Sequence, residues 1–275
     1  MIKTVAIQGV KGSFHHLVSE SYFGKSVAIL ECLSFDEAME SLKNKTADAV
    51  IMALENSIAG SILPNYTLID SNNMHIVGES YLDIQHNLMA LKGQEISEIK
   101  EVYSHPMALL QCKLFFKQYP HIKLIEDKDT AEVAQRIKLQ NLKSVAAIAS
   151  KEAAKRFELD ILAESIQTIK HNETRFVVVK RTNHEVEESQ INKASLKLVL
   201  DHKRGSLAAI LNVMSDCKLN LTKIQSLPVI DTPWKYSFFV DITFDAYEDF
   251  IKAKQILPLM AVEFKILGEY KKAKL

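Results

Sequence analysis

The segment Asn172-Glu173-Thr174-Arg175-Phe176 places an amide, a hydroxyl and a fixed cation next to one another, directly before an apolar run. An Arg guanidinium is a planar fork that pairs with a carboxylate at two points, and a Thr hydroxyl can donate a hydrogen bond. These residue types suit chemistry on a small acidic substrate. A Thr-Arg pair by itself is more often an ordinary solvated strand end, so the prediction depends on the other polar segments of the chain.

Five further polar clusters each follow a predicted strand, and four of them lead into a predicted helix. They lie at residues 8–13, 55–57, 104–105, 129–131 and 149–150. In open α/β sheets, the carboxyl ends of the strands and the N-termini of the following helices face one crevice. Helix N-termini offer free N–H groups and a positive dipole end, which favour anions. The sequence therefore predicts a cleft for a small acidic ligand.

Alternating strands and helices are expected to position these clusters throughout residues 1–180. The hydrophobic pattern predicts strands at residues 5–7, 27–32, 47–54, 75–81, 86–90, 102–103, 122–125, 144–149 and 177–180. It predicts one helix that begins at residue 13 and four further helices over residues 35–43, 107–118, 130–139 and 151–157. Ser34, Asp129 and Ser150 are expected to cap three of these helices. Strands that alternate with crossover helices imply parallel sheets.

A second domain with a different order of strands and helices is predicted after residue 193. Residues 181–193 are polar and aperiodic, which favours a linker. Residues 194–275 then show strand, helix, strand, strand, helix and strand, with a turn at 228–234. This order is the ferredoxin-like unit.

Composition excludes several functional classes. Lys+Arg and Asp+Glu both number 34, which argues against a nucleic-acid protein or a membrane-surface binder. The three cysteines are scattered, and there is no CxxC pair or metal-ligand spacing, so no metal is expected. The common glycine-rich nucleotide motifs and long apolar stretches are also absent from the sequence. With no signal-peptide pattern at the start, we expect a cytoplasmic protein.

Together, the motifs resemble those of the prephenate dehydratases. The resemblance rests on KGSF (11–14), LENSIAG (54–60), YSHPMALLQC (103–112), DTAEVA (129–134), AAIAS (146–150) and NETRF (172–176). GSL (205–207) and NLTKIQSLP (220–228) resemble the family's C-terminal ACT regulatory domain. The implied fold is α/β: a two-lobed catalytic domain like a type-2 periplasmic binding protein, plus a ferredoxin-like ACT domain. The lobes would comprise residues 1–80 with 170–180, and 81–169.

The resemblance implies decarboxylative dehydration of prephenate to phenylpyruvate in L-phenylalanine biosynthesis, with no cofactor. Thr174 would lie nearest the leaving hydroxyl, and Arg175 would hold a carboxylate. The other implied site residues are Asn56, Ser57, Ser104 and Thr130 as hydrogen-bonding groups, with Glu55, His105, Gln111, Asn172 and Phe176 around them. The proton donor remains open among Thr174, His105 and an ordered water.

For the ACT domain, the resemblance implies L-phenylalanine as allosteric effector and a homodimer or homotetramer. The implied effector site comprises Gly205, Ser206, Leu207, Ala208, Asn220, Leu221, Gln225, Ser226, Leu227 and Pro228. The family's Gly-Ala-Leu-Val and Glu-Ser-Arg-Pro differ here at both motifs, with the loss of a Glu and an Arg. The alternatives are an arogenate dehydratase and a non-catalytic sensor of amino acids or aromatic acids. The intact NETRF segment argues against the sensor.

Overall fold

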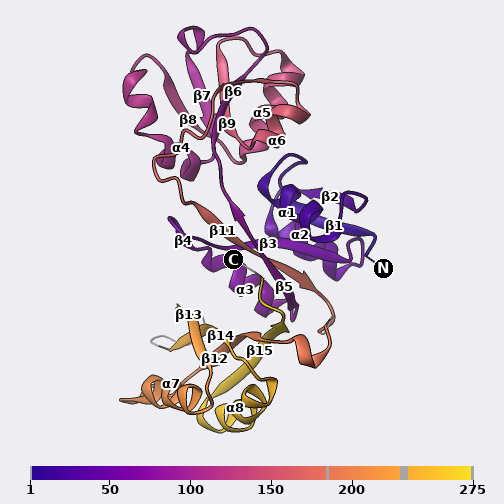
Figure 1. Cartoon of the computed structure of the whole chain (residues 1–275), viewed down its shortest axis with the longest axis vertical. Coiled ribbons are helices and arrows are strands. Elements are labelled where there is room, and N and C mark those ends of the chain that lie inside the picture. Colours follow the sequence, from indigo (N-terminus) through magenta and orange to yellow (C-terminus); the bar gives the residue numbers. More distant parts are fainter. Residues whose placement is uncertain (1, 184–185, 230–234, 274–275) are drawn as a thin grey trace. The chain divides into compact units, whose positions relative to one another are not determined.

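A computed structural model describes residues 2–183, 186–229 and 235–273 of the chain (Figure 1). Backbone contacts divide the chain into two compact units. The first consists of Met1–Gly60 and Tyr81–Phe176, and the second of Ser61–Ser80 and Val177–Leu275. Among the described residues, no helix is both long and apolar enough to cross a membrane.

The first sheet carries the NETRF segment on one of its strands. Its strand order is β2-β1-β3-β11-β5, and β4 pairs with β3 outside this path. The bounds are β1 (Thr4–Gln8), β2 (Ala28–Cys32), β3 (Ala49–Asn56), β4 (Gly60–Ser61), β5 (His75–Asp83) and β11 (Glu173–Lys180). β1 runs parallel to β2 and β3, and helices α1 (Phe14–Phe23) and α2 (Phe35–Lys43) pack against these strands. The first six residues of β3 are buried, as expected for a strand covered on both faces.

The second sheet has the strand order β10-β6-β9-β7-β8. Its strands are β6 (Asn87–Ala90), β7 (Glu101–Ser104), β8 (Lys123–Glu126), β9 (Val145–Ala149) and β10 (Asp160–Ala163). Its helices are η1 (Ile96–Glu98), α4 (Pro106–Cys112), η2 (Phe115–Gln118), α5 (Thr130–Gln140) and α6 (Lys151–Arg156). β7 is parallel to β8 and β9, but β6 is antiparallel to β9 and β10. The predicted parallel arrangement is therefore found for β7, β8 and β9 but not for β6 and β10, because not every pair of neighbouring strands in this sheet is joined by a crossover helix.

The three predicted helix caps are confirmed. Ser34 Oγ accepts from the Glu37 amide, Asp129 Oδ1 from Ala131 and Glu132, and Ser150 Oγ from Ala153. These bonds satisfy amides that have no partner within the helix. Each cap also fixes where its helix begins, directly after a strand.

The loop that follows β1 packs tightly against the helix starts of the second sheet. Gly9 has φ +90°, and a Cβ there would lie 2.7 Å from Asp129 Oδ2. A Cβ on Gly12 would lie 3.2 Å from Ala153 Cα, and the Gly12 carbonyl accepts from Ser150 Oγ at 2.6 Å. Glycine is required at both positions by conformation and by space.

Several element bounds differ from the sequence prediction. The helix expected over 107–118 ends at Cys112, and η2 follows it. Helix α3 (Leu63–Ser71) and strand β10 were not predicted; α3 has no side-chain cap, and its apolar residues do not form one stripe. β11 begins at Glu173 rather than at residue 177, so Thr174, Arg175 and Phe176 belong to the strand itself.

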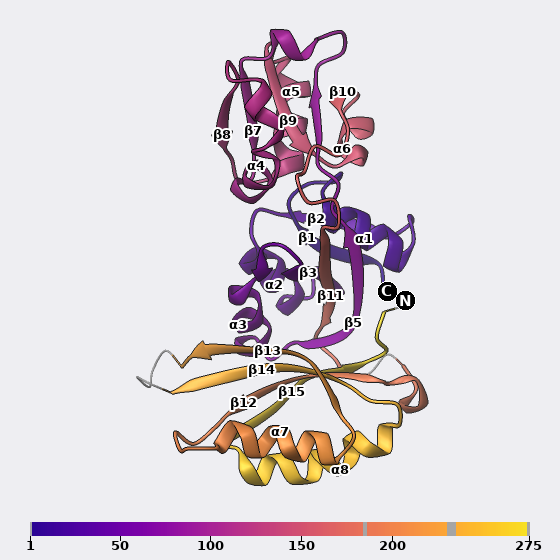
Figure 2. The ribbon, with the colours of Figure 1, turned by 60° about the vertical axis from the view of Figure 1, so that its left-hand side comes forward.

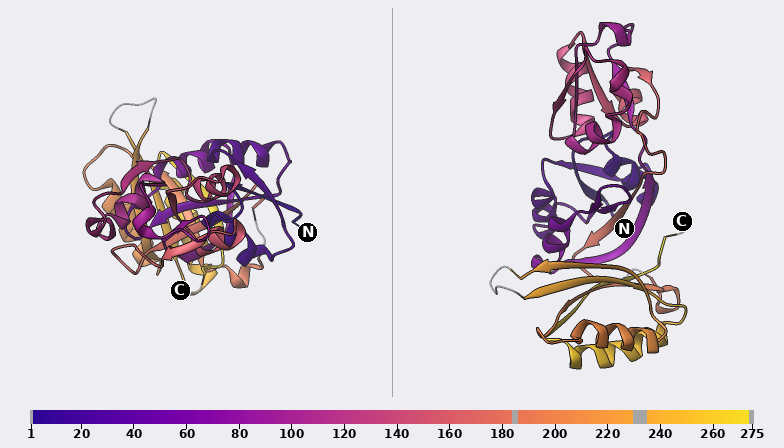
Figure 3. Two further views of the ribbon diagram at one scale, coloured as in Figure 1. Left: turned by 90° about the horizontal axis from the view of Figure 1, so that it is seen from above. Right: turned by 90° about the vertical axis from the view of Figure 1, so that its left-hand side faces the viewer.

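The predicted strand and helix order of the C-terminal region is confirmed. Its antiparallel sheet has the order β13-β14-β12-β15. The bounds are β12 (Lys193–Val199), α7 (Ser206–Asp216), β13 (Asn220–Pro228), β14 (Tyr236–Thr243), α8 (Tyr247–Met260) and β15 (Glu263–Tyr270). Helices α7 and α8 lie side by side on one face of the sheet (Figures 2 and 3). Residues 230–234 of the predicted turn lie outside the described residues.

The boundaries of the predicted linker stay a prediction. η3 (Glu188–Gln190) lies within residues 181–193, and β12 begins at the last of them. Residues 184–185 lie outside the described part of the chain.

Within the second unit, α3 and the first part of β5 pack on the C-terminal sheet. A Cβ on Gly268 would overlap the Ile76 carbonyl oxygen, so the two backbones are in contact. Lys193 Nζ lies 2.7 Å from Glu79 Oε2, and both side chains are almost fully buried. Lys265 adds a second, partly buried pair with Asp70 at 2.6 Å. Charged groups therefore hold this contact together.

Breaking the buried pair from one side will destabilise the protein. We expect Lys193→Met to lower the free energy of unfolding by about 3–5 kcal/mol, because it removes a cation from the buried Glu79 carboxylate. The double variant Glu79→Leu with Lys193→Met will recover most of that loss. Urea denaturation measures the free energy of unfolding of wild type, the single variant and the double variant. Lys203→Met, which breaks an exposed pair with Asp201, is the control and will change stability by about 0–1 kcal/mol. Equal effects of Lys193→Met and Lys203→Met would contradict the prediction.

Candidate active site

Thr174 and Asn56 form the centre of the site, on the neighbouring strands β11 and β3. Asn56 Nδ2 donates to Thr174 Oγ1 at 2.9 Å and to Asn172 Oδ1 at 2.7 Å. Asn56 Oδ1 accepts from the backbone amides of Ile58 and Ala59, at 3.0 and 2.8 Å. These two amides fix the orientation of the Asn56 side chain, because its carbonyl must face them. The Thr174 oxygen therefore accepts from Asn56, and its own proton remains available to donate.

The hydrogen-bond network extends from Asn172 into the second sheet. Asn172 Nδ2 donates to Gln111 Oε1 at 2.9 Å, and His86 Nε2 lies 2.9 Å from the same oxygen. Gln111 lies near the end of α4, whereas His86 and Asn172 belong to the two segments that connect the sheets. The Ile84 amide donates to the Asn172 backbone carbonyl and so ties these segments together. All three side chains are buried.

Backbone contacts hold the loop after β3 against the start of β11. The Ser57 amide donates to the Glu173 carbonyl at 2.8 Å, and Ser57 Oγ accepts from the Glu173 amide at 3.0 Å. The structure thus brings together Asn56, Ser57, Asn172 and Thr174, four residues that the resemblance placed in the site.

Arg175 and Phe176 lie next in β11. Successive strand residues point to opposite faces, so Thr174 and Phe176 share one face and Arg175 takes the other. Arg175 is only 3% exposed, so a cation is buried beside the network. Glu55 is half-buried at the end of β3, next to Asn56.

Ser104, His105 and Thr130 lie at strand ends and helix starts of the second sheet. Their described hydrogen bonds do not join them to the Thr174 network. Ser104 is fully buried, and its hydroxyl donates to the Ile148 carbonyl at 2.7 Å. His105 is the N-cap of α4, with Nδ1 accepting from the Met107 amide. Burial lowers the pKa of His105, and Glu126 opposes this shift. Thr130 is the first residue of α5.

His15 packs against Phe176, on the face of β11 that also carries Thr174. Its ring lies edge-on to Phe176 and Phe35, with centroid separations of 5.1 and 5.3 Å. Its Nε2 is buried and has no hydrogen-bond partner. Burial lowers the pKa of His15 to about 4, so the ring is neutral at pH 7.

The most informative residue that the sequence did not predict is His86. Its backbone amide donates to Gln167 Oε1, and its ring also meets Phe14 edge-on at 5.9 Å. The available signal was the pair His86-Asn87 at the start of an otherwise apolar strand, since a buried polar pair needs partners. Sequence pattern does not identify those partners. Among the described residues, no group of three or more His, Cys, Asp or Glu side chains is arranged to hold a metal ion.

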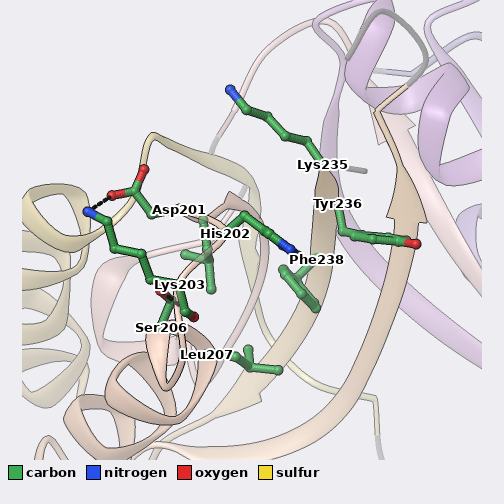
Figure 4. A pocket seen from close by; sticks show the side chains of 9 residues that line it. Asp201, His202, Lys203, Ser206, Leu207, Lys235, Tyr236 and Phe238 are labelled. Carbon is green, nitrogen blue, oxygen red and sulfur yellow. Dashed lines mark hydrogen bonds and ion pairs between the residues drawn. The ribbon is translucent and has the colours of Figure 1, made fainter. Parts of the chain in front are cut away.

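A cavity of about 130 Å³ lies in the C-terminal region, between the end of β12, the start of α7 and the start of β14. Ser206 and Leu207 are the two residues of the implied effector site that line it. Figure 4 shows Asp201 paired with Lys203 at its rim and His202 beside Phe238. The cavity is similar in volume to one that accepts a benzene ring.

These features define a two-lobed α/β protein with a hydrogen-bonding site for a small ligand, joined to a ferredoxin-like domain. The predicted fold class is thereby confirmed. Comparison with known proteins narrows the class. The family model "Prephenate dehydratase" matches residues 5–184. The chain belongs to the prephenate dehydratase family.

One relative and two solved structures extend this result. Arogenate dehydratase/prephenate dehydratase 2 of Arabidopsis thaliana is 34% identical over 97% of this chain and 72% of its own length. The prephenate dehydratase of Arthrobacter aurescens in complex with L-Phe has a TM-score of 0.87 at 25% identity, covering 98% of this chain and 89% of its own. A structure described as GqqA, a quorum quenching acylase, has a TM-score of 0.88 at 22% identity and covers 98% of both chains. At that identity, the last likeness shows the fold alone.

The neutral state of His15 will make stability depend on pH. The folded pKa of about 4 lies below the unfolded value of 6.5, so the unfolded chain binds more protons in this window. Stability is therefore present above pH 6.5 and falls as the pH decreases towards 4. We expect His15→Phe to reduce the loss between pH 6.5 and 5 by about 1.5 kcal/mol. Urea denaturation across this range measures it. Exposed His121→Gln is the control, and parallel curves for wild type and His15→Phe would exclude the effect.

Proposed function

We propose that this chain converts prephenate to phenylpyruvate, the activity that gives its family its name. The observation that carries the proposal is the direction of the hydrogen bond from Asn56 to Thr174. An oxygen that accepts from Asn56 leaves its own proton for a substrate. Dehydration of prephenate requires such a donor at the leaving hydroxyl.

The reaction balances with a single proton. The bond between the ring and its carboxylate breaks and releases carbon dioxide, and the electron pair moves into the ring. The bond to the hydroxyl then breaks at the other end, and the leaving oxygen takes up a proton as water. Aromatisation of the ring provides the driving force. The protein must orient a donor at the leaving oxygen and hold two carboxylates.

Two groups suit the charge of a dianionic substrate. Arg175 provides a buried cation, and we propose that it holds a substrate carboxylate. Thr130 starts the 11-residue helix α5, whose N-terminal dipole favours negative charge. Glu55, Ser57, Ser104, His105 and Phe176 complete the proposed site.

We further propose that residues 194–275 form an ACT regulatory domain that binds L-phenylalanine and joins copies of the chain into a homodimer or homotetramer. The strand and helix order, the cavity lined by Ser206 and Leu207, and the L-Phe complex of the Arthrobacter aurescens protein support this proposal. The cysteines Cys32, Cys112 and Cys217 are free and buried, which suits a cytoplasmic location. Arogenate dehydration is the second candidate, because the Arabidopsis thaliana relative carries both names.

Removal of the Thr174 hydroxyl will abolish most of the turnover. We expect Thr174→Val to lower kcat by about 10²-fold or more, because Val has the same shape without the donor. Thr174→Ser keeps the hydroxyl and will remain within about tenfold of wild type. Phenylpyruvate is followed by its absorbance in strong base after incubation with prephenate, and then with arogenate as substrate. No product from folded wild type on either substrate would exclude the proposed activity.

The proposal rests on the direction of the hydrogen bond from Asn56 to Thr174, and a variant that reverses this direction tests it. In Asn56→Asp, the carboxylate can only accept, so it turns the Thr174 proton inward and faces the Asn172 oxygen. We expect kcat to fall by about 10²-fold while the shape of the side chain is retained. Asn212→Asp, on the exposed side of α7, is the control with the same change of charge. Full activity of Asn56→Asp would contradict the proposed role of this bond.

Loss of the apolar lining of the C-terminal cavity will weaken the response to L-phenylalanine. In wild type, we expect L-phenylalanine to bind and to lower turnover. In Leu207→Asp, the L-phenylalanine concentration that gives half of the effect will rise by about tenfold, because a charge replaces an apolar contact of roughly 1.5 kcal/mol or more. Titration calorimetry and the turnover assay measure the two effects. Leu259→Asp, at an exposed position of α8, is the control. Turnover without any binding of L-phenylalanine would overturn the effector proposal and leave the catalytic one intact.

A further inference from the structure

His86 is buried directly before β6, and its side chain has one hydrogen bond. It is 4% exposed, and its Nε2 lies 2.9 Å from Gln111 Oε1. Its Nδ1 is buried and has no partner. Burial lowers the pKa of His86, and the bond to Gln111 only partly opposes this shift. The ring is therefore neutral at pH 7, with its proton on Nε2, because the Gln111 oxygen can only accept.

The Gln111 side-chain oxygen has two donors. One is His86 Nε2–H, and the other is Asn172 Nδ2 at 2.9 Å. If the Gln111 amide were reversed, its amino group would face both donors. Asn172 sets the observed orientation, because its own oxygen accepts from Asn56 and it presents an amino group to Gln111. In its Nε2–H tautomer, His86 supplies the second donor to the same oxygen. The Gln111 amino group is thereby left as a donor for a ligand.

We infer that His86 is a positioning residue that acts through Gln111, and that the Gln111 amino group donates to the substrate in the transition state. This inference rests on the proposed function. His86 is uncharged in this role and does not contact the substrate. Its ring holds the Gln111 amide in one of the two orientations of that amide. A dianionic substrate offers only acceptor oxygens at its carboxylates, and an amide that presents N–H matches them.

Met and Gln provide a matched pair at position 86, since they have similar length and only Gln can donate. We expect His86→Met to lower kcat by about tenfold, the value of one hydrogen bond, with KM changed by less than about threefold. His86→Gln places an N–H close to the original Nε2 and will stay within about threefold of wild type. Thermal unfolding of both variants reports any loss of packing against Phe14.

A double-mutant cycle tests the route through Gln111. If His86 acts through Gln111, His86→Met will cause no further loss in a Gln111→Ala background. Equal losses in His86→Met and His86→Gln, an active His86→Met, or additive effects with Gln111→Ala would each overturn the inference.

A spectroscopic readout separates this inference from the proposed activity. In ¹⁵N-histidine-labelled protein at pH 7.5, His86 will show a protonated Nε2 and a bare Nδ1, and the Nε2 resonance will shift in Gln111→Ala. The opposite tautomer would refute the positioning role even in an active enzyme. If wild type turned over neither prephenate nor arogenate, the proposed function would fail, and this spectrum would still decide the hydrogen bond.

Discussion

The site depends on the two backbone amides that hold the Asn56 side-chain carbonyl. Ile58 and Ala59 form a turn directly after β3, and their N–H groups leave Asn56 one way to orient its amide. Its amino group must then serve both Asn172 and Thr174. A side-chain amide can normally rotate by half a turn at little cost, which exchanges donor and acceptor. Here a local turn converts that freedom into a fixed direction, and the direction of every later bond follows.

The second feature of the site is that its histidines are uncharged at pH 7. His15, His86 and His105 all have lowered pKa values because burial disfavours the cation. In a site proposed for a dianion, histidinium ions at His15 and His86 would supply attraction at a high desolvation cost. The neutral rings provide shape instead, and those of His86 and His105 each take part in one hydrogen bond. Fixed positive charge then comes from Arg175, which cannot lose its proton under these conditions.

The C-terminal sheet is attached by a different kind of interaction. Lys193 and Glu79 are a buried ion pair, and Lys197 and Lys265 both reach Asp70. The contact combines these paired charges with the close approach of Gly268 to the Ile76 carbonyl. It fixes α3 and the first part of β5 to the sheet within one compact unit.

Local signals in the sequence predicted most of the fold but only part of the site. The helix caps at Ser34, Asp129 and Ser150 are set by neighbours within three residues, so their pattern is visible in the chain. α3 lacks such a cap and was missed. Asn56 and Thr174 are 118 residues apart, and His86 and Gln111 are 25 apart. Which of two amide groups faces which neighbour is decided by contacts of that range. No periodicity or spacing carries that information, so residue types could indicate an acidic substrate, but only the structure could give the direction of the proton.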